Sequence, residues 1–99
     1  MAIVEATITP LGTASTSISQ YVANCHKVLN HYPEIKYQLT PMGTIFEGEL
    51  STILQVIEKM HEVPFTSGAQ RVSTSIKIDD RRDKQATMSE KLRSVQEKW

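Results

Sequence analysis

The sequence has one cysteine, no excess of either charge and no long apolar run. A lone cysteine, Cys25, cannot form an internal disulfide, which favours a reducing compartment such as the cytoplasm. The apolar stretches are only a few residues long and no basic leader precedes the first strand pattern, so neither a membrane span nor a secretion signal is predicted. With 11 basic and 11 acidic residues the formal charge is zero. We therefore expect neither nucleic acid nor a membrane as a partner.

The residue groups that catalysis and metal binding need are also absent. Cys25 lies on the apolar stripe of an expected helix, where it is most simply a buried small side chain. His26 is expected to point to a different face of that helix, which argues against a nucleophile and base pair. No two histidines have metal-ligand spacing, and paired cysteines are missing. We expect a protein that is not an enzyme and that uses no metal or cofactor.

Four stretches predict strands, at residues 2–9, 35–39, 44–48 and 72–78. The first shows the clearest alternation of apolar and polar side chains, which is the period of a half-buried strand. Its inward set is expected to be Ala2, Val4, Ala6 and Ile8. The second and fourth strands are expected to turn inward Ile35, Tyr37, Leu39, Val72, Thr74, Ile76 and Ile78.

Two stretches between these strands have apolar residues at helical spacing. Ser17 and Gln20 form a capping box for the first helix, which should end near Tyr32 because Pro33 disfavours helical geometry in the residue before it. The second helix is expected from residue 49 to Pro64. Its apolar stripe is Leu50, Ile53, Leu54, Ile57 and Met60.

The order of elements predicts an α+β fold. Right-handed crossovers place both helices on one face of a four-stranded antiparallel sheet, giving a ferredoxin-like βαββαβ sandwich with one further helix at the C-terminus. We expect residues 1–84 to form a ligand-binding domain and residues 85–99 to form the last helix. Acylphosphatase chemistry in this fold would need an arginine in the loop of residues 10–17, and RNA binding would need aromatics on the central strands. The sequence supports neither.

The other face of the sheet has no helix to cover it and should therefore be solvated or meet a second copy. By the two-residue period it carries Glu5, Thr7, Lys36, Gln38, Glu47, Ser73, Ser75 and Lys77. Thr87 and Glu90 open the last helix as a capping box, and its apolar stripe is Met88, Leu92, Val95 and Trp99. The domain is complete without this helix, so we expect the stripe to dock on a neighbouring subunit in a dimer or a dimer of dimers. Docking on its own domain is the alternative.

The motif Thr-Pro-X-Gly-Thr occurs twice, at residues 9–13 and 40–44. Proline followed by glycine is an ordinary way to end a strand, but two such turns at polar strand ends favour a small-molecule site. The second copy fits a three-residue hairpin loop, Pro41-Met42-Gly43, with the glycine at the position that tolerates positive φ.

The order of elements, the paired turns and the closing run of residues 75–84 together resemble one family. This is the thiamine-binding protein family, in particular its YkoF-like, single-domain ferredoxin-like members, and the resemblance covers residues 2–84. It implies non-catalytic binding of thiamine or its hydroxymethylpyrimidine half by an oligomer, usually a tetramer built from two sheet-paired dimers. The alternative function is a structural or interaction protein that forms a homotetramer without a vitamin ligand.

An aminopyrimidine has ring-nitrogen acceptors and an amine donor, which hydroxyls and main-chain groups satisfy. The residues expected to contact the ligand are Thr40, Met42, Gly43 and Thr44 from one turn, Thr9, Gly12 and Ser15 from the other, and Glu47, Ser73 and Ser75 from the helix-free face. Two alternatives stay open: Glu5 and Glu47 could pair with Lys36 or Lys77, and the serines could simply admit a partner sheet.

Residues 79–84 hold three acids and three bases. Their simplest role is an internally compensated loop, or a lock between subunits made by arginine and carboxylate pairs. An anion site built from Arg81 and Arg82, suited to a thiamine phosphate, is the sharper hypothesis.

Overall fold

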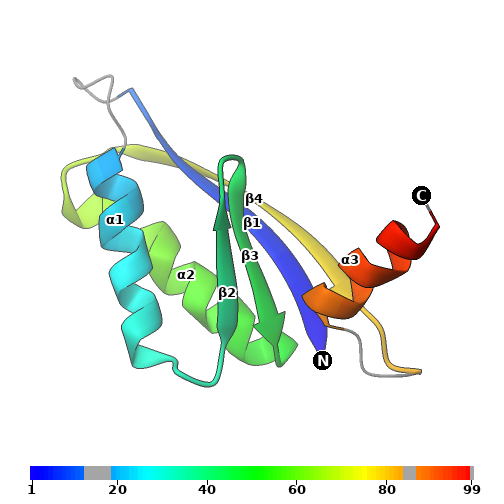
Figure 1. The fold of residues 1–99 in the computed structure, drawn as a ribbon. Coiled ribbons are helices and arrows are strands. Elements are labelled where there is room, and N and C mark those ends of the chain that lie inside the picture. The colour runs from blue at the N-terminus through cyan, green and yellow to red at the C-terminus, as the bar shows by residue number, and fades with distance from the viewer. Residues whose placement is uncertain (13–18, 84–86, 99) are drawn as a thin grey trace.

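The computed structural model describes residues 1–12, 19–83 and 87–98, and it contains the predicted four-stranded antiparallel sheet (Figure 1). The spatial order of the strands is β2-β3-β1-β4. The elements in chain order are β1 (Ala2–Leu11), α1 (Ser19–Lys27), a 3₁₀ turn (Val28–His31), β2 (Lys36–Thr40), β3 (Gly43–Gly48), α2 (Leu50–Thr66), β4 (Arg71–Asp80) and α3 (Met88–Glu97). This is the ferredoxin-like arrangement that the sequence predicts, with α3 added.

The core lies between the sheet and the helices α1 and α2. Val4 of β1 is opposite Phe46 of β3, and both side chains are fully buried. From α2, Ile53 and Val56 pack into the same cluster, whereas Glu5, the next residue along β1, is exposed. The alternation on β1 therefore fixes which face of the sheet the two helices cover.

The first helical segment changes geometry before it ends. The α-helix stops at Lys27, and a 3₁₀ turn continues to His31. The segment therefore ends where Pro33 predicts it, but its last turn is tighter, which is common at helix ends. The predicted cap at Ser17 lies outside the described residues.

The second helix runs past Pro64 to Thr66, two residues beyond its predicted end. Proline has no amide hydrogen, so it leaves the carbonyl four residues earlier without its helical donor. That carbonyl belongs to Met60, and it accepts a hydrogen bond from the Cys25 thiol at 3.3 Å. The buried cysteine thus compensates for the proline in the last turn. Leu54, predicted on the inward stripe, is partly exposed, and Val56 is buried instead.

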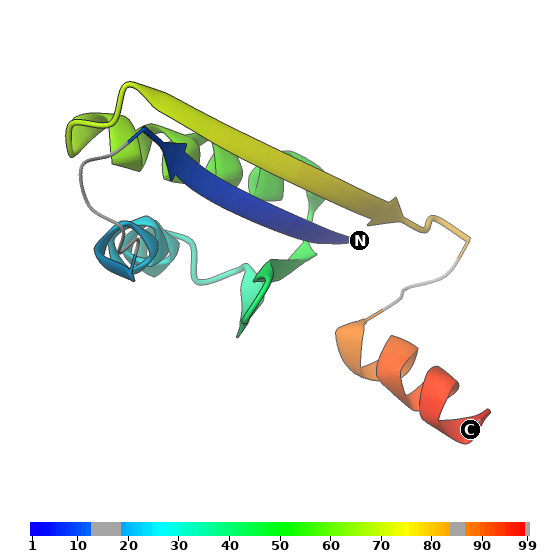
Figure 2. The same cartoon turned by 90° about the horizontal axis from the view of Figure 1, so that it is seen from above.

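The C-terminal helix lies on the opposite side of the sheet from α1 and α2 (Figure 2). Its predicted cap is confirmed, because the Thr87 hydroxyl accepts a hydrogen bond from the Glu90 amide at 3.1 Å. Leu92 and Val95 on its apolar stripe are more than half exposed. Trp99 lies outside the described residues. No helix in the described part of the chain is long and apolar enough to cross a membrane.

Candidate functional site

The β2–β3 hairpin is tighter than its sequence predicts. Thr40 pairs directly with Gly43, so the loop has two residues, Pro41 and Met42, and the predicted three-residue loop is wrong. The Thr40 hydroxyl closes the turn by donating to the Gly43 carbonyl and accepting from the amides of Met42 and Gly43, at 2.8 to 3.2 Å. These hydrogen bonds stabilise the two-residue turn.

Gly43 is required because the hairpin lies close to β1 at this position, and not because the backbone is left-handed. Its φ of 159° is extended, but a Cβ at this position would lie 2.8 Å from both the Ala6 carbonyl oxygen and the Thr7 hydroxyl. The Thr7 hydroxyl also donates to the Met42 carbonyl at 3.0 Å. These contacts hold the tip of the hairpin against β1.

Beyond the tip of the hairpin, β1 is paired with a neighbouring strand on one side only. Its pairing with β3 ends at Ala6 opposite Thr44, whereas its pairing with β4 continues to Leu11 opposite Arg71. Backbone groups of β1 on the β3 side of this stretch therefore lie beside an opening, where they can bind a ligand.

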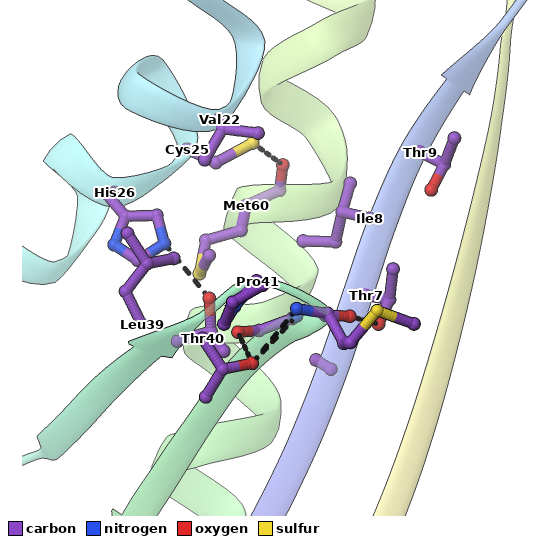
Figure 3. Close-up of a pocket in the computed structure, with 14 residues that line it drawn as sticks. Thr7, Ile8, Thr9, Val22, Cys25, His26, Leu39, Thr40, Pro41 and Met60 are labelled. Atoms are coloured by element: carbon purple, nitrogen blue, oxygen red, sulfur yellow. Dashed lines mark hydrogen bonds between the residues drawn. The ribbon is translucent and has the colours of Figure 1, made fainter. Parts of the chain in front are cut away.

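That opening is a pocket of about 280 Å³ between the hairpin, β1, α1 and α2 (Figure 3). Most of its wall is apolar, and the polar groups come from β1, α1 and the hairpin. The lining residues are Ala6, Thr7, Ile8, Thr9, Val22, Cys25, His26, Leu39, Thr40, Pro41, Met42, Gly43, Thr44 and Met60. An apolar pocket with a few convergent polar groups is the usual form of a small-molecule site.

His26 and Thr44 form the main polar pair of this pocket. The His26 Nε2 atom lies 3.0 Å from the Thr44 hydroxyl oxygen, and the imidazole makes an edge contact with the Tyr37 ring, at 5.6 Å between centroids. Burial lowers the pKa of His26, so the ring is neutral at neutral pH. A neutral imidazole and a hydroxyl can each act as donor or acceptor, so the pair can adapt to a ligand's pattern of hydrogen-bonding groups.

Cys25 also lines the pocket, but among the described residues its thiol makes no hydrogen bond to a base. Burial raises the pKa of its thiol, and the hydrogen of that thiol is directed to the Met60 carbonyl. A protonated, buried thiol is a poor nucleophile. Within the described residues no cluster of three metal-ligating side chains occurs.

The structure brings half of the ten predicted ligand residues to this pocket: Thr9, Thr40, Met42, Gly43 and Thr44. Gly12 lies just past β1, exposed, with φ of 67°, and Ser15 lies outside the described residues. Ser73 and Ser75 are exposed on β4, opposite Thr9 and Thr7. Glu47 lines a separate hollow on the other face of the sheet.

The alternative ion pairs on the helix-free face do not form. Glu47 is opposite Lys36, and Glu5 is opposite Lys77, but the salt bridges of the described chain involve none of these four side chains. Tyr37 and Leu39, predicted inward, face the helix side but are about half exposed, because β2 is the edge strand next to the pocket.

The charged segment after β4 is largely compensated within itself. Arg81 pairs with Asp83 at 2.6 Å, and Arg82 pairs with Asp80 at 2.9 Å. Lys91 of α3 pairs with Asp79 and holds the pKa of that carboxyl below its usual range. Because both arginines already have carboxylate partners, the geometry favours the compensated loop over the anion site.

The burial of His26 has a consequence for stability at mildly acidic pH. The unfolded chain takes up a proton near the ordinary histidine pKa of about 6.5, before the folded protein does, so stability falls as pH drops below that value. His26→Gln should flatten this part of the curve, measured as the thermal midpoint between pH 7.5 and 5. His31→Gln, at an exposed histidine, is the control and should keep the slope. Equal slopes in wild type and His26→Gln would contradict this assignment.

Comparison with known proteins identifies the family. The sequence model described as "Thiamine-binding protein" matches residues 4–96. The UPF0045 protein YqgV of Bacillus subtilis is 53% identical over 98 residues, which cover 96% of this chain and 94% of the relative. The chain therefore belongs to the thiamine-binding protein family.

Solved structures share the fold of this chain. A hypothetical protein from the archaeon Methanocaldococcus jannaschii matches with a TM-score of 0.85 and 35% identity, over 97% of this chain and 96% of the other. A proposed thiamine biosynthesis or salvage protein from Thermotoga maritima matches with a TM-score of 0.76 over 95% and 97% of the two chains. At 18% identity the second match shows a shared fold.

Proposed function

We propose that this member of the thiamine-binding protein family binds the hydroxymethylpyrimidine ring, free or as part of thiamine, in the pocket between the β2–β3 hairpin and α1. Binding is non-catalytic. The observation that carries the proposal is the His26–Thr44 pair at the wall of a mostly apolar pocket. The single, buried Cys25 suits a reducing compartment such as the cytoplasm.

The chemistry of the pocket matches that of an aminopyrimidine. Apolar side chains from Ile8, Val22 and Met60 suit the faces of an aromatic ring. The Thr9 and Thr44 hydroxyls, the imidazole of His26 and the open edge of β1 suit its ring nitrogens and exocyclic amine. The ring can therefore be both enclosed and oriented by groups that the structure already holds in place.

The size and charge of the pocket favour the pyrimidine half over the complete phosphorylated vitamin. A volume of about 280 Å³ is at the small end of ligand pockets. No lysine or arginine is among the described residues that line it, so phosphate groups would have to extend beyond it. We expect hydroxymethylpyrimidine and thiamine to bind with similar affinity, and thiamine diphosphate to gain nothing from its phosphates.

Calorimetric titration of the full chain with hydroxymethylpyrimidine, thiamine and thiamine diphosphate tests this proposal. The expected result is saturable heat at one site per chain with the first two ligands. No heat with any of them up to millimolar concentration would defeat the vitamin proposal. The alternative, a homotetramer that serves assembly alone, would then be favoured.

Self-association is the second part of the proposal, with the bare face of the sheet and α3 as the contact. Leu92 and Val95 on α3 are exposed, and leaving such side chains in water forgoes roughly 1.5–3 kcal/mol each. Deleting residues 87–99 should lower the mass of the particle in light scattering. An unchanged mass would mean that α3 takes no part in assembly.

A further inference from the structure

The direction of the backbone groups along β1 follows from the packing at Gly43. The Ala6 carbonyl oxygen lies on the β3 side of β1, because a Cβ at Gly43 would be 2.8 Å from it. In an antiparallel sheet, a residue points its amide and its carbonyl toward the same neighbouring strand, and the direction reverses at every residue. The pairing with β4 is continuous from Ala2 to Leu11, so this alternation holds along β1. Ile8 therefore points both its amide and its carbonyl away from β4.

On the side to which these two groups point, Ile8 has no strand partner. β3 pairs with β1 only as far as Ala6 opposite Thr44, and Ile8 lines the pocket that begins there (Figure 3). Pro10 points the same way and has no amide hydrogen, which agrees with this direction, because a proline that faced β4 would remove a hydrogen bond of that ladder. Beyond Ala6, Ile8 is thus the residue of β1 that offers both a donor and an acceptor to the pocket.

A strand residue of this kind normally forms two hydrogen bonds with the residue opposite, one through its amide and one through its carbonyl. A flat ligand can take the place of that opposite residue when it has a donor and an acceptor on neighbouring atoms. An aminopyrimidine has both, since its exocyclic amine is a donor and the ring nitrogen beside the amine is an acceptor. The main chain of Ile8 is therefore complementary to this edge of the ring.

We propose that the pocket selects heterocycles that have an amine beside a ring nitrogen, and that Ile8 recognises this edge with its main chain. The Ile8 carbonyl accepts a hydrogen bond from the amine, and the Ile8 amide donates one to the ring nitrogen. The ligand thereby extends the β3 side of the sheet by one residue position. This inference rests on the proposed function, because it assigns the ligand class and the ligand's orientation in the same pocket.

Two variants and one ligand analogue test the Ile8 amide. Ile8→Pro removes the amide hydrogen, and Ile8→Ala is the matched control, because it also loses the isoleucine side chain but keeps that hydrogen. The analogue is an aniline with the ring substituents of hydroxymethylpyrimidine and carbon in place of both ring nitrogens. Calorimetry on the full chain should give a preference for hydroxymethylpyrimidine over the aniline that is at least about tenfold smaller in Ile8→Pro than in Ile8→Ala. Equal preferences in the two variants would overturn the proposal.

Thermal unfolding checks the direction of the Ile8 amide. Ile8→Pro should unfold close to the midpoint of Ile8→Ala, because the amide that it lacks faces no strand. Thr9→Pro should unfold roughly 4–8 °C or more below Thr9→Ala, since the Thr9 amide faces β4, where Thr9 is opposite Ser73. If Ile8→Pro is as disruptive as Thr9→Pro, the Ile8 amide belongs to the ladder with β4 and the proposal is wrong.

NMR on the wild-type chain gives a measurement that needs no substitution. On titration with hydroxymethylpyrimidine the Ile8 amide proton should move downfield, because it gains a hydrogen bond. The amide proton of Thr7, which faces β4 opposite Ser75, should move less. An unchanged Ile8 amide at saturating ligand would overturn the proposal.

These experiments separate this inference from the proposed function. If hydroxymethylpyrimidine binds to the wild type but its preference over the aniline is the same in Ile8→Pro and Ile8→Ala, this inference alone fails. If hydroxymethylpyrimidine does not bind to the wild type, both fail.

Discussion

Gly43→Ala is expected to lower the free energy of unfolding by about 1–3 kcal/mol, because the added methyl group overpacks a tight contact. The new Cβ would lie 2.8 Å from the Ala6 carbonyl oxygen and from the Thr7 hydroxyl. The Ala6 carbonyl oxygen is a backbone atom of the central strand β1, so it cannot shift without disturbing the sheet. The hairpin tip must then move off β1, which breaks the hydrogen bond from Thr7 to the Met42 carbonyl.

The same movement should impair binding. The hairpin supplies Thr40, Met42 and Thr44 to the pocket, so Gly43→Ala should weaken hydroxymethylpyrimidine binding about tenfold, the equivalent of 1.4 kcal/mol. Thermal unfolding and calorimetry measure the two effects. Met42→Ala is the matched control, because this neighbouring side chain is 81% exposed and its truncation should change stability little. Wild-type stability in Gly43→Ala would show that the close approach is not needed.

Thr44→Val should weaken hydroxymethylpyrimidine binding by about 1–3 kcal/mol, or roughly 5- to 150-fold in Kd, while the protein stays folded. Valine has nearly the shape of threonine, so the packing of this buried residue is retained. The hydroxyl that pairs with His26 at 3.0 Å is lost, and both the imidazole and the bound ring then lack a partner. Calorimetry gives the change in Kd, and circular dichroism verifies the fold.

Thr66→Val provides the control for this substitution. The Thr66 hydroxyl also makes a hydrogen bond, to the Val63 carbonyl at 2.7 Å, but it lies at the end of α2 and outside the pocket. This variant should keep its affinity for the ligand. If Thr44→Val binds as tightly as Thr66→Val, the His26–Thr44 pair is not the polar centre of the site.

The fold could be predicted from the sequence because its local signals are strong. The alternation from Ala2 to Ile8 marks β1, and the Thr87 cap marks the start of α3. The hairpin loop is shorter than the sequence predicts, because the Thr40 side chain closes the turn in a way that a Pro-X-Gly pattern does not reveal. Likewise, the carbonyl that Pro64 leaves without a helical donor bonds to Cys25, a residue 39 positions before the proline in the sequence.

The site was harder to predict because it depends on where separate elements meet. The motif predicts the turn at residues 40–44, and the end of the first strand predicts Thr9. The sequence does not predict His26 as a site residue. Helical periodicity places it on a different face from Cys25, and only the fold brings Thr44 of the hairpin beside it. The burial of Glu47 could not be read from an alternating strand pattern either, because that pattern gives the face of the sheet and not what covers it.

Locating the bound pyrimidine by NMR tests the proposed binding site. Amide chemical shifts should be recorded by NMR on the ¹⁵N-labelled full chain during titration with hydroxymethylpyrimidine. We expect saturable shifts at Thr9, His26, Gly43 and Thr44, with little change at Ser73, Ser75 or Lys36. Shifts confined to the helix-free face, with none around the hairpin tip and α1, would contradict it.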